Sequence, residues 1–279
     1  MIRTLLATCA LLAAAPAAWA GCGPSPDPCA TDLGSYQAEL PRAPDRDMPV
    51  VIFLHGYGSS GANVMRNRGM VDAFLARGYA VVAPDGVPRA AGGRPGWNFR
   101  GDPGGRDEIA FLTGVLADAA ARFGLNPDAA LLAGFSSGAF MVNYLACAAP
   151  QSFAAYAPVS GGFWRPHPAA CAGPVRLFHT HGWADGTVPL EGRFLGGGRF
   201  QQGDIFAGLE IWRHANGCVD EKPSGYAETG QFWRRKWENC GEGAALEFAL
   251  FPGGHTIPPG WTDMALDWFE ALEAEDEGS

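Results

Sequence analysis

The sequence predicts an α/β fold, in which a mostly parallel β-sheet carries helices on both faces. Continuous apolar runs of strand length, such as residues 50–54, are typical of strands buried on both faces of a parallel sheet. Segments with helical apolar spacing alternate with these runs along the chain. The chain has 279 residues, of which 47% are hydrophobic, and this suits one large domain.

The first half of the domain alternates strands and helices whose ends are marked by turn residues. Gly78 follows a helical pattern and supplies the residue type that ends many helices. Pro84-Asp85-Gly86 closes the next strand, and Gly124 closes an amphipathic segment. The expected elements are a strand at 50–54, a helix at 64–77, a strand at 79–83, a loop at 86–106 and a helix at 107–123.

The second half continues the alternation but contains a long segment, 186–245, that reads as irregular apart from one helix. Parallel sheets place ligands at the carboxyl ends of their strands, so the loops after strands are where chemistry is expected. The expected elements are strands at 129–133, 153–157, 175–179 and 246–251 and helices at 138–148, 205–215 and 261–272.

Residues 1–20 have the pattern of an export signal. Arg3 is followed by an apolar stretch at 5–15, which is too short to span a bilayer, and Ala18-Trp19-Ala20 gives a small-x-small cleavage site. Cleavage there makes the protein secreted or periplasmic and begins the mature chain at Gly21. A lipid anchor on Cys22 is an open alternative, although Trp19 stands where the usual lipoprotein signal has Leu.

The cysteine count agrees with export, because six of the seven cysteines remain after cleavage. An even number in an exported chain predicts disulfides, and six cysteines allow 15 connectivities. Residues 21–35 read as a cysteine-stapled loop ahead of the catalytic domain at 36–279. No spacing typical of zinc ligands occurs, so no metal site is expected. Pairing of sequence neighbours would give Cys22–Cys29, Cys147–Cys171 and Cys218–Cys240.

Composition excludes some classes of partner. The formal net charge is −9 and no stretch of the chain is strongly basic. Binding to nucleic acid, or to an anionic membrane surface after signal cleavage, is therefore not expected.

The strongest chemical signal is Gly134-Phe135-Ser136-Ser137-Gly138, which lies between an expected strand and an expected helix. This is the context of a nucleophile elbow, a sharp turn that presents a serine hydroxyl above the sheet. Glycines flank the serine because side chains there would clash across the turn. Ser136 is therefore the candidate nucleophile.

A serine nucleophile needs a base and an acid that orients the base. Asp185 follows the strand at 175–179 and His255 follows the strand at 246–251, in the order Ser, Asp, His that this kind of sheet requires. Asp204 reads instead as a helix N-cap, and Asp220 follows no strand. The other histidines, His167, His179, His181 and His214, have no paired partner in the sequence and are interpreted as structural or exposed.

Two backbone N–H groups are candidates for stabilising an oxyanion. One is the N–H of Ser137, directly after the nucleophile, and the other is the N–H of Tyr57 in the glycine-rich loop after the strand at 50–54. His55 in the same loop is expected to shape the loop rather than to take part in chemistry.

Seven stretches of the chain resemble the secreted polyhydroxybutyrate depolymerase and feruloyl esterase group of α/β-hydrolases. The resemblance implies the α/β-hydrolase fold in a single domain, the triad Ser136, Asp185 and His255, ester substrates and no cofactor. The chain departs from the group at Ser137, where members often have Asn, and at Ile257, where they often have Trp. The stretches are LHGYGSSG (54–61), GRDEIAFLTGVL (105–116), LLAGFSSGAFMVNYLAC (131–147), FAAYAPVSGG (153–162), HGWADGTVPLEG (181–192), RHANGC (213–218) and PGGHTIPPG (252–260).

The resemblance implies polyhydroxyalkanoate oligomers, feruloyl or other aryl esters, or acetyl esters as substrates, including esters attached to polymers or polysaccharides. Trp97 and Trp164 are interpreted as loop packing, whereas Trp183, two residues before Asp185, is expected to contact substrate. A peptidase of the same fold and a non-catalytic binding protein on a hydrolase frame are the alternatives. The lack of room for a gating domain argues against the peptidase, and an intact triad argues against the binding protein.

Overall fold

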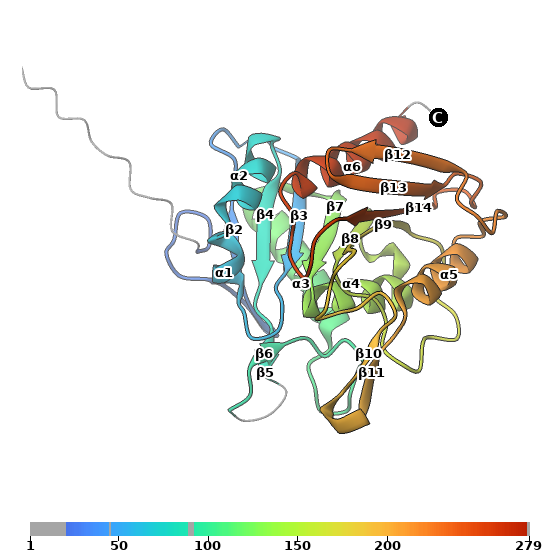
Figure 1. Ribbon diagram of the computed structural model, residues 1–279. Helices are drawn as coiled ribbons and strands as arrows, with labels where there is room; N and C mark the ends of the chain where they lie inside the picture. Colours follow the sequence, from blue (N-terminus) through green and yellow to red (C-terminus); the bar gives the residue numbers. More distant parts are fainter. Residues whose placement is uncertain (1–20, 45, 89–91, 278–279) are drawn as a thin grey trace, which may run out of the picture.

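The computed structural model describes residues 21–44, 46–88 and 92–277, and a ten-stranded β-sheet runs through its centre (Figure 1). The strands of this sheet are β1 (Cys29–Thr31), β2 (Gly34–Glu39), β3 (Met48–Leu54), β4 (Ala80–Pro84), β7 (Leu125–Phe135), β8 (Ala155–Val159), β9 (Arg176–Gly182), β12 (Gly225–Thr229), β13 (Phe232–Trp237) and β14 (Ala245–Phe251). Their order across the sheet is β1-β2-β4-β3-β7-β8-β9-β14-β13-β12.

The central strands β4, β3, β7, β8, β9 and β14 are parallel, and antiparallel strands extend the sheet at each side. Helices cover both faces, which explains why the parallel strands are apolar along almost their whole length. The expected α/β fold is therefore confirmed. The helices are α1 (Gly61–Met65), α2 (Arg68–Ala76), α3 (Glu108–Phe123), α4 (Ser137–Ala148), α5 (Ile205–Ala215) and α6 (Trp261–Glu277).

Two apolar clusters lie on opposite faces of the sheet. The buried side chains of α1, α2 and α6 form one cluster, and those of α3, α4 and α5 form the other. Trp261 is fully buried in the first cluster, where its indole meets the rings of Phe53 and Phe74 edge-on. Side-chain caps set the helix starts: Asp107 accepts the N–H of Ala110, and Asp204 accepts the N–H of Ala207.

The helix expected at 64–77 is two helices. Ser60 accepts the N–H of Asn63 and so starts α1 earlier than its apolar spacing indicates. Asn67 interrupts the helical backbone, with φ −75° and ψ 73°, and α2 begins after it. The break separates α1, which packs on β4, from α2, which packs on α6 as well as β4.

The prediction of an irregular segment at 186–245 was wrong in part. It contains the hairpin β10 (Arg193–Leu195) and β11 (Phe200–Gln202), joined by the 3₁₀ turn η2 (Gly196–Gly198), and the hairpin β12–β13. The sequence FWRRKW of β13 has no simple alternation, because its buried residues stand only at its ends. Pairing with β14 makes it a strand.

The loop expected at 86–106 contains the short strands β5 (Val87–Pro88) and β6 (Pro95–Gly96). The β5–β6 and β10–β11 hairpins project from the edge of the sheet at which β4 ends (Figure 1). The remaining 3₁₀ turn, η1 (Pro150–Ser152), connects α4 to β8.

The N-terminal segment 21–35 is more ordered than a loop, because β1 and the start of β2 join it to the sheet. The expected signal peptide, residues 1–20, lies outside the described residues. Among the described residues no helix has the length and apolarity needed to cross a membrane. Disulfides join Cys22 to Cys29, Cys147 to Cys171 and Cys218 to Cys240, the three pairs that local pairing selects.

Candidate active site

Ser136 lies on the turn between β7 and α4, at the carboxyl edge of the sheet. Its backbone has φ 56° and ψ −114°, a conformation that L-residues rarely adopt. A Cβ at Gly138 would lie 2.2 Å from the carbonyl oxygen of Leu54, and one at Gly134 would lie 2.8 Å from Gly138. Only glycine fits at either position, so the two glycines allow the tight turn that holds the half-buried serine in its strained conformation.

The side chains of Ser136, His255 and Asp185 are connected by hydrogen bonds. The Ser136 hydroxyl and His255 Nε2 are 2.9 Å apart, and His255 Nδ1 is 2.7 Å from Asp185 Oδ2. The other Asp185 oxygen, Oδ1, accepts the N–H groups of Thr187 and Val188 at 2.9 and 2.8 Å. The fold therefore brings together residues that are 119 and 70 positions apart in sequence.

The two competing aspartates lie elsewhere. Asp204 caps α5 through Ala207, as its position indicates. Asp220 accepts a hydrogen bond from the side chain of Asn239 at 2.6 Å. Neither carboxylate has a contact with His255.

Pairing of β9 with β14 sets the separation between Asp185 and His255. Gly182 and Phe251 are register partners at the ends of these neighbouring parallel strands. Beyond them, the N–H of Trp183 donates to Phe251 O, and the N–H of Ala184 donates to Gly253 O, both at 2.8 Å. The two loops thus leave the sheet fastened to each other, which holds the imidazole against the carboxylate.

Asp185 is buried, with a side chain that is 0% exposed. Burial opposes its ionisation, but hydrogen bonds from His255 and from the Val188 N–H outweigh burial and hold its pKa below the usual value. The carboxylate is therefore charged at neutral pH and can stabilise an imidazolium on His255.

Phe135, the residue before the serine, packs against the imidazole of His255 with ring centroids 4.7 Å apart. Sequence reasoning did not assign this residue a role. Its position within the elbow is the only signal that could have pointed to it, because an elbow places its neighbours close to the base.

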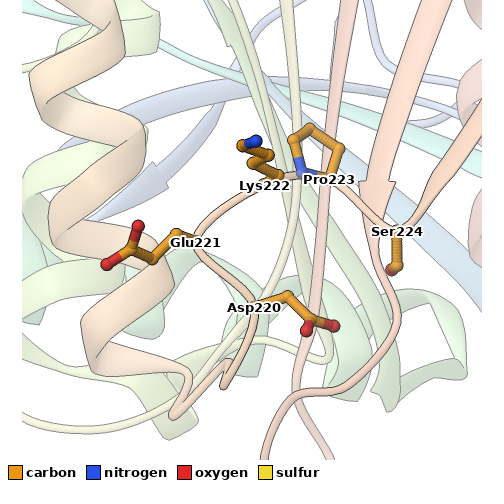
Figure 2. Close-up of a pocket in the computed structure, with 5 residues that line it drawn as sticks. All are labelled: Asp220, Glu221, Lys222, Pro223 and Ser224. Atoms are coloured by element: carbon orange, nitrogen blue, oxygen red, sulfur yellow. The ribbon is translucent and has the colours of Figure 1, made fainter.

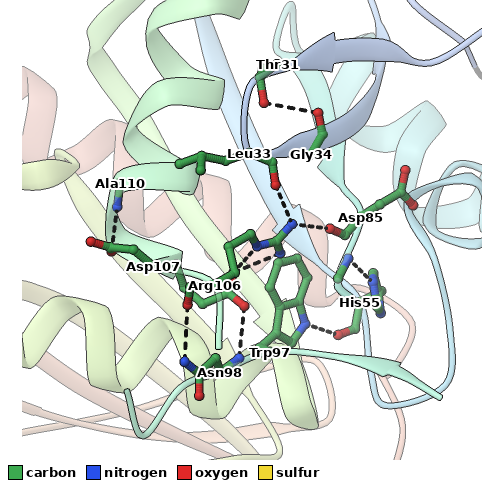
Figure 3. A network of polar contacts seen from close by, with 12 residues as sticks. Thr31, Leu33, Gly34, His55, Asp85, Trp97, Asn98, Arg106, Asp107 and Ala110 are labelled. Atoms are coloured by element: carbon green, nitrogen blue, oxygen red, sulfur yellow. Dashed lines mark hydrogen bonds and ion pairs between the residues drawn. The ribbon is translucent and has the colours of Figure 1, made fainter. Parts of the chain in front are cut away.

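The loop after β3 is held by the network around His55 (Figure 3). His55 Nδ1–H donates to Gly56 O at 2.7 Å, and His55 Nε2 accepts the N–H of Gly86 at 2.8 Å. Trp97 Nε1–H donates to His55 O at 2.8 Å. Burial lowers the pKa of His55, which favours the neutral ring that these bonds require. His55 shapes the loop, as expected from the sequence.

A buried ion pair between Arg106 and Glu108 contacts Trp97, which holds this loop; Figure 3 labels Arg106 and Trp97. Arg106 donates from Nε and Nη2 to Glu108 Oε2 at 3.0 and 2.8 Å, and their side chains are 6% and 1% exposed. The Arg106 guanidinium also lies over the rings of Trp97 and Phe111, and Glu108 accepts the N–H of Asn98. Both residues fall in the stretch GRDEIAF, which was noted only as part of the resemblance.

The two N–H groups expected at an oxyanion site, those of Tyr57 and Ser137, belong to this loop and to the first turn of α4. Within the described part of the chain, neither donates a hydrogen bond to another residue. The loop rises next to the elbow, since a Cβ at Gly56 would lie 3.5 Å from the Ser136 Cβ. The free N–H groups thus belong to a residue that follows the nucleophile directly, Ser137, and to one that follows its spatial neighbour Gly56, Tyr57.

Aromatic side chains lie exposed on the loops of this edge. Trp183 is 62% exposed and Tyr57 is 64% exposed. Trp97, by contrast, is buried beneath the loop of His55, and Trp164 packs among aromatic rings, as the packing interpretation predicts. Trp183 and Tyr57 are thus large exposed rings on the two loops that flank Ser136.

Two surface depressions lie away from these residues. One, of about 420 Å³, lies at the loop from Asp220 to Ser224 (Figure 2), and one of about 570 Å³ lies between the β1–β2 turn and α3. The first depression is lined mainly by charged loop residues, and the second by mostly apolar residues beside Asp118. Ser136 lines neither of them. The described residues contain no group of three metal-ligating side chains.

Comparison with known proteins points to the same chemistry. Residues 35–188, more than half of the chain, match the Esterase family model, which spans Ser136 and Asp185. Feruloyl esterase C of Emericella nidulans is 24% identical over 235 residues, covering 80% of this chain and 77% of that protein. NocK of Nocardia uniformis subsp. tsuyamanensis, which is named as an esterase, is 31% identical over 147 residues, 52% of this chain and 42% of its own length.

Solved structures share the fold. An acetyl xylan esterase from Aspergillus awamori superposes with a TM-score of 0.63 at 16% identity, covering 85% of this chain and 93% of that one. The esterase PE8 gives a TM-score of 0.55 at 22% identity, covering 86% and 98%. The family match and the fold together show that this chain belongs to the Esterase family of α/β-hydrolases and is a carboxylic-ester hydrolase.

Proposed function

We propose that this protein is an exported serine esterase that cleaves its substrate through an acyl-enzyme on Ser136. The observation that carries the proposal is the unbroken hydrogen-bond series from the Ser136 hydroxyl through His255 to the buried Asp185 carboxylate. A serine hydroxyl at such an elbow, next to an imidazole with an oriented tautomer, has the parts that acyl transfer needs.

In the proposed reaction, Ser136 Oγ attacks the ester carbonyl while His255 Nε2 accepts the hydroxyl proton. The negative charge on the carbonyl oxygen is stabilised by the N–H groups of Tyr57 and Ser137. The tetrahedral intermediate collapses, and the alcohol leaves with the proton from His255. Water then attacks the acyl-serine by the same route, which releases the carboxylic acid and restores the serine.

Asp185 acts on His255 in this scheme and does not take the proton. Its Oδ2 accepts the Nδ1–H of the imidazole, which leaves Nε2 free to receive the proton of Ser136. Its negative charge also stabilises the imidazolium that forms in each half of the reaction.

The proposed substrates are soluble aryl, feruloyl-type or acetyl esters, including those attached to polysaccharide. The names of the feruloyl esterase relatives and of the acetyl xylan esterase support this class. The exposed rings of Trp183 and Tyr57 could pack against an aromatic acyl group. Polyhydroxyalkanoate oligomers belong to the same test panel. Export is supported by the three disulfides, which form in oxidising compartments.

The proposal is tested with Ser136→Ala, with Ser152→Ala on the turn before β8 as the matched serine control. Hydrolysis of p-nitrophenyl acetate should fall by on the order of 10⁴-fold or more in kcat for the first variant, because triad members act as one unit. The control should keep wild-type activity.

A Ser136→Ala protein that retains a tenth of wild-type activity would show that another nucleophile acts. A panel of methyl ferulate, acetylated xylan and hydroxybutyrate oligomers then ranks the substrates. Cleavage of a peptide amide in preference to all of them would favour a peptidase, and no cleavage of any ester would favour a binding protein.

A further inference from the structure

Two histidines lie in the interior of β9, at positions where parallel strands normally carry apolar residues. His179 is 2% exposed and His181 is 0% exposed, and both side chains point to the same face of the sheet, two residues apart. Their rings are stacked, with centroids 5.4 Å apart and an angle of 18° between the planes. A buried imidazole needs hydrogen-bond partners, so the pair calls for a physical explanation.

The hydrogen bonds of the pair have a defined direction. His181 Nε2 is 2.8 Å from the carbonyl oxygen of Val188, which can only accept, so Nε2 carries the proton. In a neutral ring Nδ1 is then an acceptor, and it lies 3.1 Å from His179 Nε2. His179 therefore donates to His181, and this bond selects the tautomer that allows His181 to hold Val188.

The backbone of Val188 connects the two buried histidines to Asp185. The N–H of Val188 donates to Asp185 Oδ1 at 2.8 Å, so one residue contacts the carboxylate with its N–H and His181 with its carbonyl. His181 Nε2 itself lies 3.6 Å from Asp185 Oδ2, the oxygen that accepts His255. His181 thus fastens the turn that determines where the carboxylate points.

Neutrality matters at this position. A proton added at His181 Nδ1 would face the N–H of His179, and the resulting cation would compete with His255 for Asp185. Burial lowers the pKa of both rings, and in His179 the nearby His181 adds to the effect. The negative charge of Asp185 therefore remains available to His255.

We propose that His181 is a positioning residue for Asp185 and that His179 sets its tautomer, so that the buried pair orients the acid of the triad. The proposal rests on the proposed function, because it requires that Asp185 act through His255. It concerns residues that touch neither substrate nor the serine, and its effect should appear in kcat rather than in KM.

The test uses His181→Gln and His181→Asn in the full-length protein, with His214→Asn on the exposed face of α5 as control. A glutamine amide nitrogen falls near the position of the imidazole Nε2 and can still donate to Val188 O. An asparagine amide falls near Nδ1 and cannot reach it. We expect kcat on p-nitrophenyl acetate to fall by about 10²-fold for His181→Asn, the effect of a misplaced catalytic group, while KM stays within about twofold.

His181→Gln should recover most of that loss, and His214→Asn should show none. Equal thermal unfolding temperatures for the Gln and Asn variants would exclude a difference in stability as the cause. Should His181→Asn fail to fold, His179→Gln and His179→Asn take the place of the two His181 variants. His179→Gln keeps an amide donor near His179 Nε2 and should retain activity, whereas His179→Asn places its amide near Nδ1, loses the donor to His181 and should lower kcat. Equal kcat losses in the Gln and Asn variants, or wild-type kcat in both, would overturn the proposal.

A double-mutant cycle with Asp185→Asn separates this proposal from the proposed function. If His181 acts through the acid, His181→Asn should cause no further loss of kcat in the Asp185→Asn background. Additive losses would mean that His181 acts independently of Asp185, which overturns the inference and leaves the triad intact. Near wild-type activity of Asp185→Asn alone would overturn the assignment of the acid, and with it both proposals.

Discussion

The two loops that flank Ser136 are supported in different ways. Behind the loop of Tyr57 lies a buried ion pair, Arg106 with Glu108, connected to the loop through Trp97 and His55. Behind the loop of Asp185, in the part of the chain that the structure describes, the buried polar support consists of the imidazoles of His179 and His181. The buried support is thus a charged pair on one side of the nucleophile and a neutral pair on the other.

The difference follows from what each loop must do. The loop of Tyr57 presents backbone N–H groups. The opposite charges of Arg106 and Glu108 neutralise each other, so this ion pair can fix the backbone without adding a net charge. The loop of Asp185 presents a carboxylate that acts through its interaction with His255. A buried cation next to it would take that interaction over, so neutral donors are the support that preserves it.

The largest expected effect is on the side of the acid. Asp185→Asn should lower kcat by about 10²- to 10⁴-fold, because an amide can hold His255 in the wrong tautomer and cannot stabilise the imidazolium. Steady-state kinetics on p-nitrophenyl acetate measures it. Asp204→Asn, which removes only the cap of α5, is the matched control and should leave kcat unchanged. An essential Asp204 or Asp220 beside a dispensable Asp185 would show that the acid is misassigned.

On the other side, Glu108→Gln should destabilise the protein by about 3–5 kcal/mol, because it leaves the Arg106 guanidinium buried without a counter-charge. Urea unfolding followed by tryptophan fluorescence measures the loss. The comparison predicts a smaller loss for His181→Gln, where one neutral donor replaces another. The double variant Arg106→Met/Glu108→Leu should recover much of the stability lost in Glu108→Gln. Equal losses in the free energy of unfolding for Glu108→Gln and His181→Gln would show that the charged support of the Tyr57 loop and the neutral support of the Asp185 loop do not differ in this respect.

The buried histidines predict a pH dependence of stability. The pKa values of His179, His181 and His55 are lowered in the folded protein, so at mildly acidic pH the unfolded chain binds more protons. The contribution of these rings to the free energy of unfolding is therefore fully present above about pH 6.5, the pKa of histidine in an unfolded chain. Below that pH the free energy of unfolding falls by up to about 1.4 kcal/mol per pH unit for each ring.

Urea midpoints between pH 5 and 7.5 measure this slope, and the slope should decrease in His181→Gln and in His55→Gln. The exposed His214 offers the control, since His214→Asn should leave the slope as it is. A slope unchanged in all three variants would show that the buried rings are not the groups that titrate.

The smallest expected effect concerns the exposed ring that each loop presents. Trp183→Ala should lower kcat/KM for an ester with an aromatic acyl group, such as methyl ferulate, by about 3- to 10-fold relative to p-nitrophenyl acetate, whose acyl group is acetyl, since aromatic stacking contributes about 0.5–1.5 kcal/mol. Tyr57→Ala provides the counterpart on the other loop. Losses that are equal for both esters would assign Trp183 a packing role only.

Much of the site could be predicted because its signals are local. The two glycines that flank Ser136, where no Cβ fits, indicate the elbow directly. The positions of Asp185 and His255 follow from the strands that precede them. The caps Asp107 and Asp204 act within three residues of their own position. Each of these features depends on backbone sterics or on periodicity, which a sequence displays directly.

What only the tertiary structure decided are the contacts between distant segments. The strand β13 exists through its pairing with β14, and its mixed aromatic and basic sequence, FWRRKW, has no alternation that would predict a strand. Trp97 reaches His55 over 42 positions, and Phe135 meets His255 across the elbow. His179 and His181 interrupt an apolar run in a way that allows several interpretations. Their role depends on which carbonyl and which carboxylate the folded chain brings within hydrogen-bond distance, and a one-dimensional pattern carries no information about that distance.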